Sequence, residues 1–183
     1  GGINLIEISN YPEASVSPLY LDPKTQWELE SRLLLVYLGS PHSSSEVHKL
    51  VIQKMEESQT FRKKLDPLRK CAEEGKFALL AGDIEAFGGA MTRNTEAQRD
   101  LHPDLVGKKA QAVISIARDF QISGYKVNGA GGDGGSVTLL LPAGLHQRLE
   151  LCRRLSALAP GVRAIPVTIA PNGLRRWEQG FDE

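Results

Sequence analysis

Five glycines fall within seven positions, between residues 129 and 135, directly before the apolar run SVTLLLP. Each glycine in a regular element lowers stability by roughly 0.5–1 kcal/mol relative to alanine, because glycine loses more backbone freedom on folding. A folded chain retains so many glycines where the backbone passes through positive φ, or where another group comes very close to it. The stretch therefore predicts one of these two constraints.

The segments on either side of the glycines decide which known glycine motifs they can form. A dinucleotide-binding fold requires a helix after its glycines, whereas residues 136–142 have the pattern of a strand. The lysine and hydroxyl pair of a P-loop is also missing. A hairpin between two strands fits the context, but a hairpin needs only one or two glycines. The excess predicts that a partner approaches the backbone here.

The hydrophobic pattern predicts an α+β fold. Apolar runs of strand length occupy residues 3–9, 14–21, 32–39, 136–142 and 162–170. Helical spacing predicts helices within residues 40–58, 60–74, 83–101, 105–120 and 143–160, and residues 22–31 are predicted as a loop. This order of elements favours a mostly antiparallel sheet covered by helices.

The predicted helix over residues 83–101 carries two amides on its apolar stripe. Asn94 and Gln98 continue the spacing of Ile84, Phe87 and Met91 toward the interior. A buried amide without a hydrogen-bond partner costs about 1–3 kcal/mol, so both side chains need partners. Two interpretations stay open, a hydrogen bond between helices and a pair of amides that faces a polar ligand.

Composition excludes several classes of partner. The 183 residues carry 22 basic and 22 acidic side chains, so the net charge gives no general attraction to nucleic acid or to an anionic membrane surface. The sequence contains no apolar run long enough to span a membrane. Its two cysteines, Cys71 and Cys152, are far apart and favour reduced thiols in a cytoplasmic protein.

Several motifs in sequence order resemble the GHMP small-molecule kinases, named after galactokinase, homoserine kinase, mevalonate kinase and phosphomevalonate kinase. The segment KVNGAGGDGGSVTLL is similar to their third motif, K-x-x-GAGGGG followed by a strand. Three more stretches resemble segments of the heptose 7-phosphate kinases and fucokinases within that superfamily. They are RLLLVYLGSPHSSSEVH, GGINLIEI and NTEAQRDLHPDL. The resemblance extends over nearly the whole chain.

The resemblance implies ATP-dependent phosphorylation of a sugar or sugar phosphate, with Mg²⁺ bound alongside ATP. It implies the ferredoxin-like C-terminal domain of such a kinase over residues 29–183, preceded by two strands of the N-terminal domain within residues 1–28. The implied nucleotide and phosphate contacts are Gly129, Ala130, Gly131, Gly132, Asp133, Gly134 and Gly135. The implied substrate-binding residues are His42, Ser43, Ser44, Ser45, Asn94 and Gln98.

The sequence also departs from the family pattern. Asp133 stands where the family often has glycine, and its carboxylate would repel a triphosphate unless it points away or meets Mg²⁺. His42 stands where related kinases often have arginine, and it could meet a sugar phosphate when protonated or form an exposed turn. The family's N-terminal motif, its G-L-G-S-S-S-A motif and its catalytic aspartate are missing.

These departures leave three hypotheses open. The first is the C-terminal part of a sugar kinase, inactive alone and completed by the N-terminal half of the same kinase. The second is a non-catalytic module that binds a small ligand and retains the fold. The third is an unrelated α+β interaction domain with the glycines in a hairpin.

Overall fold

A computed structural model describes residues 1–41, 45–129, 131–132, 134–144, 147–174 and 176–177, together with the backbone but not the side chains of residues 45, 46 and 48. The chain divides into two compact units. One comprises residues 1–20 and the segment from residue 168 onward, and the other comprises residues 21–167. The boundary predicted at residue 28 concerns the halves of a longer kinase, and it stays a prediction.

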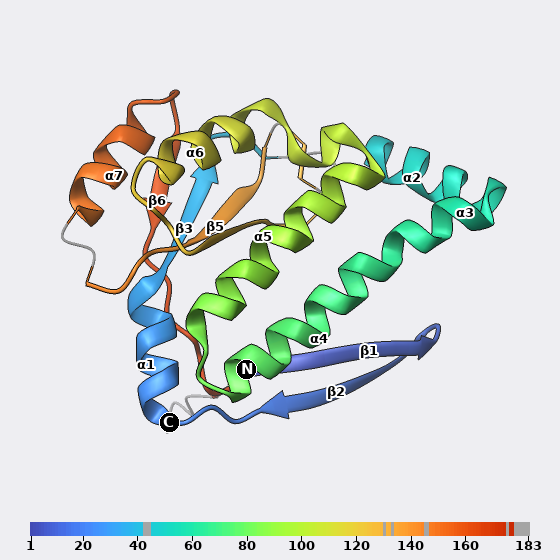
Figure 1. The fold of residues 1–183 in the computed structure, drawn as a ribbon, viewed down its shortest axis with the longest axis horizontal. Coiled ribbons are helices and arrows are strands. Elements are labelled where there is room, and N and C mark those ends of the chain that lie inside the picture. The colour runs from blue at the N-terminus through green and yellow to red at the C-terminus, as the bar shows by residue number, and fades with distance from the viewer. Residues whose placement is uncertain (42–44, 130, 133, 145–146, 175, 178–183) are drawn as a thin grey trace, which may run out of the picture. The chain divides into compact units, whose positions relative to one another are not determined.

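The smaller unit is built on a two-stranded antiparallel sheet (Figure 1). Strand β1 (Ile3–Asn10) pairs with β2 (Glu13–Leu19), and Ile6 lies opposite Val16. Both of these side chains are more than half exposed. The backbone amide of Gly2 donates to the carbonyl of Ala170, which ties the C-terminal segment to this sheet.

The larger unit contains a four-stranded sheet with the order β4-β5-β3-β6. Its strands are β3 (Leu33–Leu38), β4 (Gly124–Val127), β5 (Ser136–Leu140) and β6 (Val162–Ile165). Every neighbouring pair is antiparallel. Helices connect β3 to β4 and β5 to β6, and a hairpin connects β4 to β5. This connectivity and strand order form a ferredoxin-like core, so the predicted α+β fold is confirmed.

Helices α6 (Lys108–Arg118) and α7 (Arg148–Ser156) cover one face of this sheet (Figure 1). The strands alternate, so that Leu34, Val36 and Leu38 of β3 are buried while the residues between them are half-buried. Helix α6 contributes a fully buried stripe at helical spacing, with Ala110, Val113 and Ala117. The single apolar layer between helices and sheet is the main core of the unit.

The segment predicted as a loop, residues 22–31, is instead helical. Helix α1 (Pro23–Arg32) begins at Asp22, whose carboxylate accepts hydrogen bonds from the amides of Lys24 and Thr25. Proline at the first helical position needs no amide partner and has a favourable φ. The N-terminal signals therefore outweigh the weak apolar pattern of this segment.

The remaining helices form an extension beside the sheet. They are α2 (Ser45–Glu57), α3 (Gln59–Arg62), the 3₁₀ turn η1 (Lys63–Leu65), α4 (Asp66–Leu80), α5 (Ile84–Leu101) and the 3₁₀ turn η2 (Pro103–Val106). Helices α4 and α5 run side by side (Figure 1). Within the described part of the chain, no helix combines the length and apolar character that a bilayer span requires.

Helix α5 also closes the open edge of the sheet along β4. The hydroxyl of Thr92 accepts from the amide of Tyr125, and the hydroxyl of Thr95 accepts from the amide of Val127. Thr95 is fully buried, and its hydroxyl also lies 3.3 Å from the carbonyl of Met91 in its own helix and from the carbonyl of Tyr125 in β4. These bonds satisfy edge-strand amides that would otherwise be open to pairing with another chain.

Candidate functional site

A cavity of about 560 Å³ lies where three segments of the larger unit converge. The first segment leaves β3 and enters α2, the second runs from η2 into α6, and the third is the glycine loop, defined as residues 129–135. The described lining residues are Ser40, Pro41, Val47, Pro103, Asp104, Val106, Gly107, Lys108, Gln111, Gly132 and Gly134. The loop that the sequence singles out therefore borders a cavity large enough for a small polar molecule.

Both constraints predicted for the glycine loop are present. Gly129, Gly131, Gly132 and Gly135 all have φ between 61° and 80°. Gly131 also approaches η2 so closely that a Cβ atom would lie 1.7 Å from the carbonyl oxygen of Leu105. The partner that comes close to the loop is thus the chain's own backbone.

Hydrogen bonds hold the glycine loop to the other two segments. The amide of Gly132 donates to the carbonyl of Asp104, and the amide of Gly135 donates to the carbonyl of Ser40, each over 3.0 Å. These two amides are therefore already paired inside the protein. The predicted contact with a phosphate stays a prediction, and it requires other amides of the loop.

Two lysines lie at the cavity, Lys108 in its lining and Lys109 beside it. Lys108 lines it at the start of α6, and Lys109 Nζ donates to the hydroxyl of Ser40 over 3.1 Å. The described lining contains one carboxylate, Asp104, whose side chain is 73% exposed. Helix α6 begins without a side-chain cap. This charge balance favours an anionic ligand.

Of the predicted substrate-binding residues, the structure places only some. His42, Ser43 and Ser44 lie outside the described residues, and Ser45 begins α2 with its side chain undescribed. Their neighbours Pro41 and Val47 line the cavity. Ala130 and Asp133 of the glycine loop also lie outside the described residues.

The two predicted amides of α5 have different surroundings. Gln98 is 6% exposed, and its Nε2 donates to the carbonyl of Gly129 over 2.8 Å. Its Oε1 accepts from Lys126 Nζ over 3.0 Å. Asn94 is half-buried one turn earlier, and neither amide is among the described lining of the cavity. Gln98 thus holds the glycine loop through Gly129 without lining the cavity itself.

Sequence reasoning missed the polar side chains of the described lining, namely Ser40, Asp104, Lys108 and Gln111. These residues come from segments about 70 residues apart and share no local pattern. The HPDL stretch within the family resemblance was the signal closest to them. Its position at η2 brings Pro103 and Asp104 to the glycine loop.

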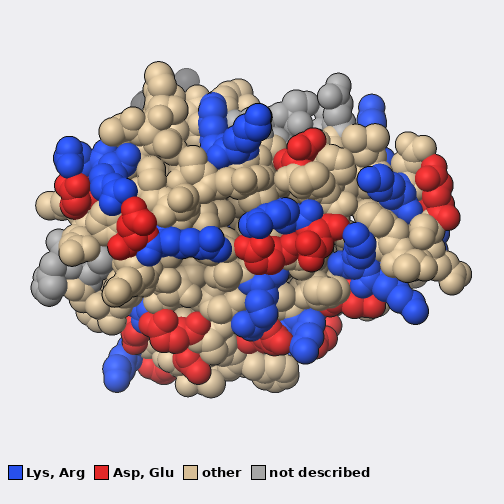
Figure 2. All heavy atoms as spheres, turned by 45° about the horizontal axis from the view of Figure 1, so that its top comes forward, with Lys and Arg blue, Asp and Glu red and all other residues tan. Residues whose placement is uncertain are grey.

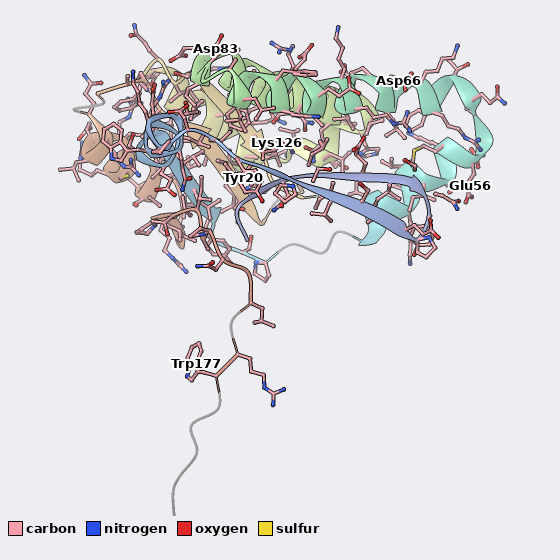
Figure 3. All side chains as sticks on the ribbon, turned by 90° about the horizontal axis from the view of Figure 1, so that it is seen from below. Tyr20, Glu56, Asp66, Asp83, Lys126 and Trp177 are labelled. Carbon is pink, nitrogen blue, oxygen red and sulfur yellow. The ribbon has the colours of Figure 1, made fainter. Side chains whose placement is uncertain are left out.

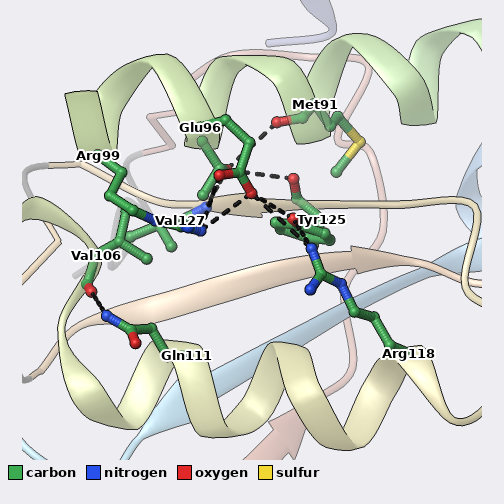
Figure 4. Close-up of polar contacts among 9 residues, drawn as sticks. Met91, Glu96, Arg99, Val106, Gln111, Arg118, Tyr125 and Val127 are labelled. Carbon is green, nitrogen blue, oxygen red and sulfur yellow. Dashed lines mark hydrogen bonds and ion pairs between the residues drawn. The ribbon is translucent and has the colours of Figure 1, made fainter. Parts of the chain in front are cut away.

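A second polar cluster lies between α5 and α6 (Figure 4). The hydroxyl of Tyr125 donates to Glu96 and accepts from Arg118, each over 2.6 Å. Arg99 pairs with the same carboxylate over 2.9 Å. Burial, followed by the hydrogen bond to Glu96, raises the pKa of Tyr125 above its ordinary value. The cluster joins the two helices to β4.

The raised pKa predicts a loss of stability at alkaline pH. The unfolded chain releases the Tyr125 proton near its ordinary pKa, while the folded protein retains it to higher pH. The free energy of unfolding therefore falls as pH rises from about 10 through the folded pKa. Urea unfolding between pH 8 and 11 should show a steeper fall for the unaltered chain than for Tyr125→Phe. Equal slopes would contradict this assignment.

The described residues contain no group of three or more His, Cys, Asp or Glu side chains that could hold a metal ion. Asp104 is the single carboxylate among the described lining residues, and one carboxylate alone does not form a magnesium site. Cys71 and Cys152 are both free, as predicted. On the face shown in Figure 2, basic and acidic side chains are interspersed, and neither sign gathers into a patch.

The fold is that of the GHMP-type kinases. Leishmania mevalonate kinase (L. major, in complex with R-mevalonate) matches with a TM-score of 0.70 and 20% identity, over 93% of this chain and 50% of the kinase. A D-glycero-D-manno-heptose 1-phosphate kinase from Bacteroides thetaiotaomicron matches with a TM-score of 0.62 and 19% identity, over 97% and 46%. Galactokinase from Lactococcus lactis matches with a TM-score of 0.58 and 11% identity, over 90% and 52%.

Two sugar kinases of Arabidopsis thaliana are related in sequence. A bifunctional fucokinase/GDP-fucose pyrophosphorylase is 29% identical over 140 residues, which are 74% of this chain and 13% of that protein. A probable glucuronokinase is 27% identical over 148 residues, which are 78% of this chain and 39% of that protein. No protein-family model matches the chain. The resemblance predicted from the glycine motif is confirmed, and the chain spans about half or less of these kinases.

Proposed function

We propose that the chain forms part of an ATP-dependent sugar kinase, which transfers the γ-phosphoryl group of ATP to a sugar hydroxyl. The observation that carries this proposal is the convergence of the glycine loop, η2 and the start of α2 on one cavity, with Lys108 in its lining and Lys109 beside it. Phosphoryl transfer depends mainly on positioning and on stabilising negative charge, and a loop tied to η2 and Ser40 beside two lysines serves both. The fucokinase and glucuronokinase relatives support a sugar as the acceptor.

The acceptor that we propose is an anionic sugar, and heptose 7-phosphate or a related sugar phosphate is the specific candidate. Lys108 and Lys109 are placed to attract its charged group. His42, Ser43, Ser44 and Ser45 belong to the segment that connects two lining residues, Pro41 and Val47, so we retain them as substrate contacts. Gln98 is proposed to act on the substrate through the glycine loop that it supports. Asn94, one turn earlier on α5, is retained as a proposed substrate contact.

The chain supplies only part of the reaction in this proposal. No catalytic base can be assigned among the described residues, and the described part of the chain offers no magnesium site. ATP and Mg²⁺ would be held largely by an N-terminal half with the triphosphate motif, in a cytoplasmic enzyme. When bound, Mg²⁺ neutralises charge on the phosphates. The chain alone should therefore bind the sugar phosphate without transferring phosphate to it.

Isothermal titration calorimetry tests this proposal on the chain as it stands. We expect heptose 7-phosphate to bind, Mg-ATP to bind far more weakly, and Lys108→Met to weaken sugar-phosphate binding about tenfold, as expected for one lost charge-assisted contact. Lys76→Met, on helix α4, is the matched control and should leave binding unchanged. Sugar-phosphate binding that is absent or indifferent to Lys108 would overturn the site and favour a non-catalytic module.

A further inference from the structure

Lys126 is a half-buried lysine without a carboxylate partner among the described residues. It lies on β4, three residues before the first glycine of the glycine loop. Its Nζ donates to Gln98 Oε1 over 3.0 Å and to the carbonyl of Val127. Figure 3 shows Lys126 within the larger unit, whereas Glu56 and Asp66 lie at the far end of its helices.

The contacts of Gln98 form a relay from Lys126 to the glycine loop. Gln98 accepts from the ammonium group through Oε1 and donates through Nε2 to the carbonyl of Gly129. The two ends of a glutamine amide have nearly the same shape but opposite hydrogen-bonding character. An ammonium group can only donate, so it selects the orientation of the amide that also bonds Gly129. The reversed orientation would place NH₂ against the ammonium group and oxygen against a carbonyl.

We propose that Lys126 is a positioning residue of the kinase site, which fixes the orientation of Gln98 and thereby the entry of the glycine loop at Gly129. This inference rests on the proposed function for its role in phosphoryl transfer, whereas the relay itself depends only on the chain. The ammonium group is retained at a cost, because desolvation lowers the pKa of Lys126. A residue needed only for stability would be served better by an apolar side chain of the same length.

Amide hydrogen exchange and side-chain NMR test the relay without any ligand. We expect Lys126→Met to speed exchange at the amides of Gly132 and Gly135 about tenfold, the factor for roughly one lost hydrogen bond. The melting temperature should stay the same or rise, because a desolvated cation is removed. The Gln98 side-chain amide should change from one fixed pair of NMR signals to an averaged pair. Lys126→Arg, which can also only donate, should restore the single orientation.

Gln98→Glu removes only one of the two contacts of Gln98. The carboxylate still pairs with Lys126 but cannot donate to Gly129, so loop exchange should be as fast as in Gln98→Met while stability is retained. Lys64→Met is the matched control, because Lys64 likewise donates to α5, in its case to the backbone carbonyl of Asp100 over 3.0 Å. It should leave the glycine loop unchanged.

Two results would overturn the inference. One is loop exchange that does not respond to Lys126→Met or Gln98→Glu. The other is exchange that accelerates evenly over the whole chain, which would indicate a general loss of stability. The proposed function fails separately. If the chain did not bind the sugar phosphate in calorimetry while exchange in its glycine loop still responded to these variants, the proposed function would be wrong and the relay would stand.

Discussion

Replacing Gly131 with alanine is expected to displace the glycine loop and to abolish sugar-phosphate binding by the chain. The new Cβ atom would lie 1.7 Å from the carbonyl oxygen of Leu105 and 2.6 Å from its carbonyl carbon, both of them backbone atoms that cannot move aside alone. The φ of 67° adds the strain of a left-handed conformation. We expect the free energy of unfolding to fall by about 3–4 kcal/mol, within the range of severe steric substitutions.

Leu105 explains why this effect should spread beyond the loop. It is 4% exposed and packs with Val51 and Leu101 in a small cluster that joins α2 to α5. Moving its backbone therefore disturbs η2 and the start of α2, which both line the cavity. Urea unfolding and calorimetric titration with heptose 7-phosphate measure the two expected losses.

Gly135→Ala is the matched control for this prediction. Gly135 has a φ of 79°, but its added Cβ would meet no atom within 4 Å. The substitution should therefore lower stability only by the conformational strain, about 1–2 kcal/mol. If the two alanine variants lost the same stability, strain alone would explain the glycines, and the close approach to Leu105 would not be needed.

The glycine loop shows how far the sequence could predict the site. The number of glycines predicts positive φ or a close approach, and both occur at Gly131. The identity of the approaching group could not be predicted from composition, because Leu105 belongs to a 3₁₀ turn that no local pattern links to the hairpin. Only the tertiary fold brings these two stretches of backbone together.

For helix α5, too, the sequence predicts part of the arrangement and only the structure shows the rest. Its apolar stripe correctly predicts that Gln98 points inward, and the structure adds that the amide bonds a loop rather than another helix. Thr95 was missed, although it is fully buried, because a threonine among polar residues gives no apolar signal. Its burial follows from the exposed edge of β4, whose amides need acceptors that the neighbouring helix supplies.

Residues 22–31 were predicted as a loop and Arg32 as the start of a strand, yet helix α1 ends at Arg32, whose side chain connects several segments of the larger unit. Arg32 is 4% exposed. Its Nε donates to the carbonyl of Leu141 over 2.7 Å, and its guanidinium also bonds the hydroxyl of Ser123. Glu28 and Glu85 supply its counter-charges, so four segments meet at one guanidinium group.

Arg32→Met is expected to lower the free energy of unfolding by about 3 kcal/mol, because a buried carbonyl and a hydroxyl lose their charged donor together. Methionine retains the apolar stem of the side chain, so the loss reports the hydrogen bonds rather than a cavity. Urea unfolding at neutral pH measures it.

Glu85→Gln separates the ion pair of Arg32 with Glu85 from the hydrogen bonds of Arg32 to the Leu141 carbonyl and the Ser123 hydroxyl. The side chain of Glu85 is 65% exposed, so its ion pair with Arg32 is screened by water and contributes less than about 1 kcal/mol. A large loss in Arg32→Met with a small loss in Glu85→Gln would assign the stability to the backbone and hydroxyl bonds. Similar losses in both variants would contradict that assignment, since the exposed ion pair would then hold α1 against α5.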